Sequence, residues 1–237
     1  MAHDSRLPVS LLPLAWAAVL ATTGTMHAMR LAGVNVEEAA LTLGFTSSWE
    51  LSLLVYSIYQ LATVLALLLA IRRLVPHGLA ALGFRKPRGL RYYVYAVLLV
   101  PVASMIWFLC SIIVRSIGLS MWWTSRSMVA INSVQDLVVY VVSAVAICAT
   151  MEEVMYRGYV LTALMQRVKS LVLAFTLDAL VFSSIHYAFG PGVMLFIFLW
   201  TYIPCWLYTR SGSLYPPMVF HVSNNLLAYV VLPLLLR

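Results

Sequence analysis

Long apolar stretches dominate this chain and decide what it can fold into. Segments of about 17–25 apolar residues, the length that a helix needs to cross a bilayer, recur about seven times. They lie at residues 9–29, 51–71, 92–114, 137–155, 171–189, 193–209 and 216–236. The sequence therefore predicts an all-α fold, a polytopic transmembrane helical bundle of about seven spans.

The composition excludes a water-facing surface for most of the chain. Only 10% of the 237 residues are charged and 63% are hydrophobic, whereas a soluble domain carries roughly a quarter charged residues. The lipid bilayer is the expected partner. The net charge of +7 does not indicate nucleic acid, because no basic stripe with interleaved aromatic residues is present. Each of the three cysteines lies in an apolar run without CxxC spacing, so we expect small core residues rather than a metal or disulfide framework.

The basic residues predict the orientation. Lys and Arg concentrate in the loop 72–91, which by the positive-inside rule is cytoplasmic. Alternation of the spans places further basic residues on the same side: Arg6, Arg167, Lys169 and Arg210. The opposite side receives Glu37, Glu38, Glu50 and Asp136, with a thinner scatter of Arg30, Arg115 and Arg126. We therefore expect a protein of a prokaryotic cytoplasmic membrane, with its N-terminus cytoplasmic and its C-terminus outside.

The chain shows no internal repeat and no low-complexity linker. We expect a single membrane domain over 1–237, with N-terminal spans in 9–134 and the functional helical core in 135–237. The apolar run that ends near Met29 lacks a clear cleavage site, so we interpret it as a retained first span. The tryptophans Trp49, Trp107, Trp122 and Trp123 are expected to include the interfacial aromatic residues.

Ionisable side chains inside the apolar segments are few. Each costs roughly 2.5–3.5 kcal/mol at a helix centre, so each needs a partner or a function. They are His27, Glu152, Glu153, Arg157, Asp178, His186 and His221, with Asn225 as a polar companion. All but His27 lie in the C-terminal third. We interpret His27 as a packing residue.

Helical spacing separates two roles within this group. Glu153 and Arg157 are four residues apart, glutamate first, which favours a helical ion pair. Glu152 lies about 100° round the helix and stays unpaired, as suits a general base. His186 shares a helical face with Phe182, and Asn225 shares one with His221.

A rise of 1.5 Å per residue tests whether these groups lie at one depth. Above the turn at residues 167–170, Glu152 stands about 22 Å and His186 about 24 Å. Asp178 comes level with Arg157, which predicts a bridge between the two helices. His221 rises only about 10 Å above a helix start near residue 214. The depths agree only if the 167–170 turn projects further and residues 190–192 form a buried turn.

Three motifs carry a resemblance to a known family. They read Glu152-Glu153-Val-Met-Tyr-Arg157, Phe182-Ser-Ser-Ile-His186 and His221-Val-Ser-Asn-Asn225. In this order they resemble EExxxR, FxxxH and HxxxN of the CAAX-protease and bacteriocin-processing family of glutamate-type intramembrane proteases, also called CPBP or Abi. The resemblance covers about residues 137–229.

The resemblance implies a set of roles. Glu152 and His186 match the residues that hold and activate the attacking water, while His221 and Asn225 match the pair that stabilises the oxyanion. Glu153 and Arg157 match a structural pair. No cofactor is implied. Glu152, His186 and His221 are the residues that would bind zinc, but the chain has no HExxH motif, so we favour a metal-independent reaction.

These observations predict an intramembrane endopeptidase acting on a membrane-anchored peptide or protein. The substrate is a prenylated tail, a leader or bacteriocin precursor, or a C-terminal sorting anchor. The main alternative is an immunity or scaffold protein that retains the residues without proteolysis. A transporter with a proton relay would predict inverted repeats or broken helices, and the sequence has neither.

Overall fold

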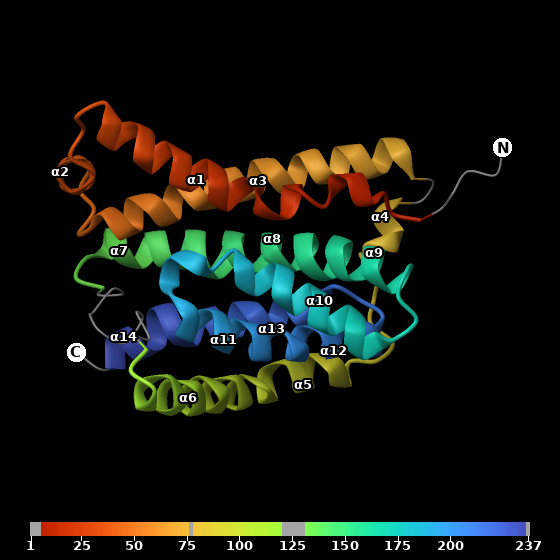
Figure 1. Cartoon of the computed structure of the whole chain (residues 1–237). Coiled ribbons are helices and arrows are strands. Elements are labelled where there is room, and N and C mark those ends of the chain that lie inside the picture. Colours follow the sequence, from red (N-terminus) through yellow and green to blue (C-terminus); the bar gives the residue numbers. More distant parts are fainter. Residues whose placement is uncertain (1–5, 76–77, 120–130, 236–237) are drawn as a thin grey trace.

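The computed structural model describes residues 6–75, 78–119 and 131–235, and every regular element in these ranges is helical. Within them, six helical segments are long and apolar enough to cross a membrane: Val9–Leu31, Ser48–Leu74, Arg91–Ser116, Val134–Met165, Pro191–Ser211 and Tyr215–Leu235. They run along one common direction (Figure 1). The prediction of an all-α polytopic bundle is confirmed. Trp122, Trp123 and Arg126 lie outside the described residues.

The N-terminal elements lie on two sides of the bundle. They are η1 (Val9–Leu11), α1 (Leu14–Leu31), α2 (Val36–Thr42), α3 (Ser48–Leu74), α4 (Gly78–Ala81), α5 (Arg91–Leu98) and α6 (Val100–Ser116). Helices α1 and α3 lie along one side, and α5 and α6 lie along the opposite side (Figure 1). α1 and α3 pack against each other, and α6 packs instead against the C-terminal helices. α5 and α6 are separated at Leu99 because Pro101 cannot donate the backbone hydrogen bond that would continue the helix.

One long helical segment at the centre of the bundle carries the two adjacent glutamates. It runs through α7 (Val134–Val139), α8 (Ala149–Glu153) and α9 (Thr162–Met165), joined by wider π-type turns over Tyr140–Cys148 and Val154–Leu161. Ser133 and Asp136 start it with reciprocal capping hydrogen bonds. Turns of the π type are frequent at functional sites.

The remaining helices lie between the central segment and the pair α5 and α6 (Figure 1). They are α10 (Leu171–Ser184), η5 (Tyr187–Phe189), α11 (Pro191–Trp200), α12 (Tyr202–Ser211), α13 (Tyr215–Leu226), η6 (Leu227–Val231) and α14 (Leu232–Leu235). α13 packs on α12, α5 and α8. The largest hydrophobic cluster joins these helices to α1 and α3.

The predicted span 171–189 is wrong in length. α10 is a helix of 14 residues, too short to cross a bilayer alone. The chain turns at Gly190, whose φ of 84° is readily accessible only to glycine, and Gly192 is buried. Figure 1 shows this turn stopping short of the end where α2 and α14 lie. A turn that lies short of the bundle end, as required for the groups to lie at one depth, is thus present, although within it Pro191 is exposed and only Gly192 is buried.

A second deep turn lies at the opposite end, between α12 and α13. Ser211, Ser213 and Leu214 are fully buried beneath the basic segment Gly83–Arg88. Backbone hydrogen bonds join Arg88 N to Ser211 O (2.9 Å) and Leu214 N to Gly83 O (2.9 Å). α13 therefore starts inside the bundle, which brings His221 to the depth of Glu152.

Candidate active site

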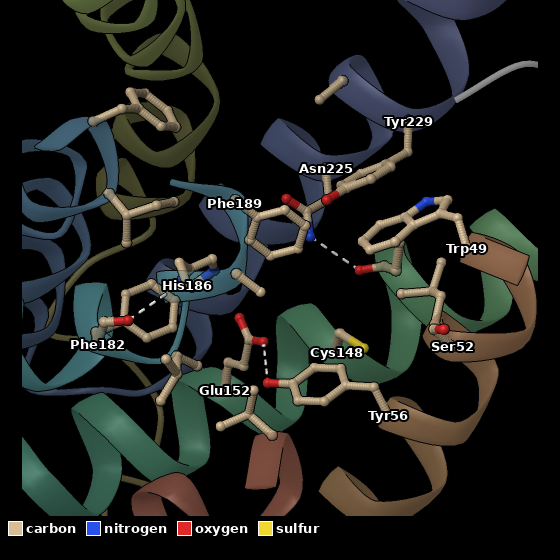
Figure 2. Close-up of a pocket in the computed structure, with 18 of the residues that line it drawn as sticks. Trp49, Ser52, Tyr56, Cys148, Glu152, Phe182, His186, Phe189, Asn225 and Tyr229 are labelled. Carbon is tan, nitrogen blue, oxygen red and sulfur yellow. Dashed lines mark hydrogen bonds between the residues drawn. The ribbon is translucent and has the colours of Figure 1, made fainter. Parts of the chain in front are cut away.

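Glu152, His186, His221 and Asn225 line one cavity of about 790 Å³. Glu152 comes from α8, His186 follows α10, and His221 and Asn225 lie on α13. Figure 2 shows Glu152, His186 and Asn225 directed into this space from three sides. The three motifs, which are separated in sequence by up to about 70 residues, thus meet at one point inside the bundle.

His221 contacts both glutamates. Its Nδ1–H donates to Glu153 Oε1 at 2.8 Å, and its Nε2 lies 3.7 Å from Glu152 Oε2. Because Glu153 accepts at Nδ1, the orientation of the ring is fixed and Nε2 faces Glu152 and the cavity. The sequence predicted Glu153 as the partner of Arg157 alone; in the structure it also positions His221.

Tyr56 is the site residue that sequence reasoning missed. Its hydroxyl donates to Glu152 Oε1 at 2.8 Å (Figure 2). Tyr56 lies on α3, 96 residues before Glu152 in the sequence and outside all three motifs. The expectation that Glu152 has no partner is therefore wrong. A buried tyrosine hydroxyl needs an acceptor, so a tyrosine within an apolar span was the available signal.

His186 is held in one tautomer. Its Nδ1 lies 3.0 Å from Phe182 O, and since a carbonyl only accepts, Nδ1 carries the proton. Nε2 is then an acceptor. The Phe182 ring packs edge-on against the His186 ring, with centroids 5.0 Å apart. Phe182 therefore contacts His186 in two ways, through its carbonyl oxygen and through its ring, on the helical face that the sequence predicted.

Asn225 is oriented by the central helix. Its Nδ2 donates to Ala144 O at 3.0 Å, which uses one of the two amide hydrogens and leaves the second. Ala144 lies in the wide-turn stretch Tyr140–Cys148. The Asn225 side chain is thereby held over the cavity, facing Glu152 across it (Figure 2).

A fully buried ion network lies directly behind the site. Arg157 Nη1 is 3.2 Å from Glu153 Oε1, and Arg157 Nε is 3.8 Å from Asp178 Oδ2. The Arg157 guanidinium also lies over the Phe182 ring at 4.7 Å, a favourable cation–π geometry. Cys205 donates its S–H to Asp178 Oδ2 at 3.2 Å. The bridge between the helices of Arg157 and Asp178 that was predicted from depth is present, and all three cysteines are buried as expected.

His27 does not fit its interpretation as a packing residue. It is exposed on α1 and lines the same cavity as the motif residues. Thr22, Met26 and Arg30 of α1 and Trp49 and Ser52 of α3 do so too. The N-terminal spans therefore form part of the cavity wall.

Three side chains that could bind zinc line the same cavity. Among the described residues, no group of three His, Cys, Asp or Glu side chains is arranged to hold a metal ion. His221 Nδ1 donates to Glu153 and His186 Nδ1 donates to Phe182 O, which leaves Nε2 of each ring as its possible ligand atom. The metal-independent reaction, which the sequence favours over zinc bound by Glu152, His186 and His221, therefore stays a prediction.

The Tyr56 contact leads to a first prediction. We expect Tyr56→Phe to lower the rate of the reaction at this site by about 10- to 100-fold, because a hydrogen bond to a charged group contributes about 1.5–3 kcal/mol. The change keeps the ring and removes only the donor to Glu152. Turnover of purified protein measures it, and Tyr59→Phe on the same helix is the matched control. Equal rates for wild type and Tyr56→Phe would show that this hydrogen bond does not position Glu152.

Comparison with known proteins gives one family. Residues 134–227 match the family described as type II CAAX prenyl endopeptidase Rce1-like. The matched region holds all three motifs and leaves α1 to α6 outside it. No curated protein and no solved structure matches the chain.

Proposed function

We propose that this chain is a glutamate-type endopeptidase that hydrolyses a peptide bond inside the membrane, because residues 134–227 match the family described as type II CAAX prenyl endopeptidase Rce1-like. In general terms the chain is an integral membrane protein and a CAAX-type protease. The proposal concerns the residues that carry the reaction and the substrates that it acts on.

One observation supports the proposal above the others. A carboxylate, two imidazoles and a carboxamide meet around one cavity within apolar helices. Peptide hydrolysis needs an activated water and donors that face the developing oxyanion. Glu152 with His186 supplies the first requirement, and His221 with Asn225 supplies the second.

The tautomers of the two histidines assign the proton transfers. Glu152 takes a proton from a water that also donates to His186 Nε2, and the hydroxide adds to the peptide carbonyl carbon. The resulting oxyanion accepts from His221 Nε2–H and from the second Asn225 Nδ2–H. His221 Nδ1 and Nε2 each face a glutamate oxygen, at 2.8 Å from Glu153 Oε1 and 3.7 Å from Glu152 Oε2, so a ring that carries a proton on each nitrogen has an acceptor for both. Glu152 then returns its proton to the leaving amine, which completes the hydrolysis.

Glu152 works here without a metal or cofactor. The substrate class is a membrane-anchored peptide: a prenylated tail, a leader or bacteriocin precursor, or a C-terminal sorting anchor. The cavity favours a peptide substrate over a small polar metabolite, because it is large and is lined mostly by aromatic and aliphatic side chains.

Comparative proteomics of membranes tests the proposal. Cells with the wild-type chain are compared with cells that carry Glu152→Ala, and we expect one or more uncleaved membrane-anchored precursors to accumulate in the variant. The new peptide ends found only with the wild type give the scissile bond. If Glu152→Ala and His186→Ala both preserve the cellular phenotype and no precursor accumulates, the chain acts as a scaffold or immunity protein instead.

A further inference from the structure

The two ends of the bundle differ sharply in charge. Ten of the 15 Lys and Arg residues lie at one end of the bundle. This end is formed by the segment before α1, the end of α3, the segment 85–91, the α9–α10 turn and the end of α12. The ten residues are Arg6, Arg72, Arg73, Arg85, Lys86, Arg88, Arg91, Arg167, Lys169 and Arg210. We name this end the basic end. Figure 1 places α2 and the start of α7 at the other end. Glu37, Glu38, Glu50 and Asp136 lie there together with Arg30 and Arg115, so we name it the acidic end.

Within the part of the chain that the structure describes, the cavity reaches one of these ends and not the other. On α1, which runs away from the basic end, its lining begins at Val19 and continues to Arg30, one residue before the helix ends. On α3, which returns, the lining comprises Trp49, at the second position of the helix, through Tyr56. On α13 and its extension the lining runs from His221 to Leu232. All three helices therefore carry the cavity from the level of Glu152 to the acidic end.

The opposite route is filled by side chains. Beyond Glu152 towards the basic end, Arg157, Tyr159 and Leu161 of the central helix are fully buried. Leu7 and Leu82 are fully buried there as well. Tyr159 donates to Pro8 O at 2.5 Å, and Arg167 Nη2 donates to Leu7 O at 2.7 Å, so the segment before α1 is tied across this end.

We propose that the active site opens to the non-cytoplasmic face of the membrane, so that its substrates are peptide segments that have already been exported. The basic end is cytoplasmic by the positive-inside rule, and the cavity opens at the other. This inference rests on the proposed function and narrows it. It favours a leader peptide or sorting anchor on the outer side over a prenylated tail held at the cytoplasmic leaflet.

Cysteine labelling of the full-length chain tests the inference without using activity. The background carries Cys148→Ala, since Cys148 is the native thiol in the cavity wall. This background keeps the buried Cys110 and Cys205, and its own labelling gives the baseline. Three added cysteines, each compared with that baseline, report on three places: Glu38→Cys on the outer helix α2, Ser52→Cys in the cavity, and Lys169→Cys at the basic end. Intact cells are treated with a membrane-impermeant maleimide, before and after permeabilisation.

We expect Glu38→Cys and Ser52→Cys to react in intact cells and Lys169→Cys only after permeabilisation. Labelling of Lys169→Cys from outside would overturn the orientation. Ser52→Cys that stays unlabelled in intact cells while Glu38→Cys reacts would overturn the outward opening. Because labelling does not depend on catalysis, retained cleavage by a Glu152→Ala chain would remove the proposed function and leave these patterns unchanged.

Discussion

Replacing Glu152 with glutamine lowers peptide cleavage by about 10²–10⁴-fold, the contribution of a positioned general base, and leaves the protein folded. Glutamine keeps the shape of the side chain, and its carbonyl oxygen still accepts from the Tyr56 hydroxyl, which lies 2.8 Å from Glu152 Oε1. It cannot take a proton from water at neutral pH. The measurement is the turnover of a precursor identified by proteomics, with purified wild-type and variant protein in detergent or vesicles.

Two controls distinguish Glu152 as the general base from a general effect of removing a carboxylate and from a metal-dependent reaction. Glu38→Gln changes an exposed carboxylate on α2 and should leave turnover unchanged. A strong chelator should also leave the wild-type rate unchanged, because the proposed reaction uses the carboxylate itself as the base. Full turnover by Glu152→Gln would refute the proposed mechanism, and loss of activity with a chelator would replace it with a metal-dependent one.

Much of the site could be predicted because its polar residues lie in segments that are otherwise apolar. An ionisable side chain within a span is costly, so Glu152, Asp178, His186 and His221 were conspicuous without any knowledge of the fold. Helical geometry then predicted the Glu153–Arg157 pair and the Arg157–Asp178 bridge, whose contacts measure 3.2 and 3.8 Å. Both predictions depend on spacing along a helix, which the sequence specifies directly, and both hold although Arg157 lies in the wide-turn stretch Val154–Leu161.

The features of the fold and the site that could not be predicted depend on breaks in helices or on contacts between distant parts of the chain. The length of α10 could not be read from hydropathy, because the apolar run continues through the turn at Gly190. The α12–α13 turn is buried only because the segment Gly83–Arg88 covers it, a contact between distant parts of the chain. Tyr56 was missed for a related reason: its partner, Glu152, is 96 residues away, and no periodicity encodes such a pairing.

Replacing Arg157 with methionine should destabilise the folded protein strongly. The variant leaves Glu153 and Asp178 fully buried without their shared cation, and breaking a buried ion pair in this way costs about 3–5 kcal/mol. For a chain of this size that corresponds to a fall of about 6–20 °C in the unfolding midpoint. Thermal unfolding of purified protein in detergent measures it. Arg210→Met, at an exposed position near the end of α12, is the matched control.

A second substitution shows whether the loss comes from charge rather than from packing. Asp178→Asn in the Arg157→Met protein removes one of the two stranded carboxylates, so it should recover part of the lost midpoint. Asp178→Asn alone should instead destabilise the wild type, because it weakens the contact between the central helix and α10. If the double variant is as unstable as Arg157→Met, the loss reflects the cavity left above the Phe182 ring, where the guanidinium packs at 4.7 Å. Recovery would show that Arg157 is present to neutralise the carboxylates, and through Glu153, which accepts from His221 at 2.8 Å, to keep that imidazole aligned with Glu152.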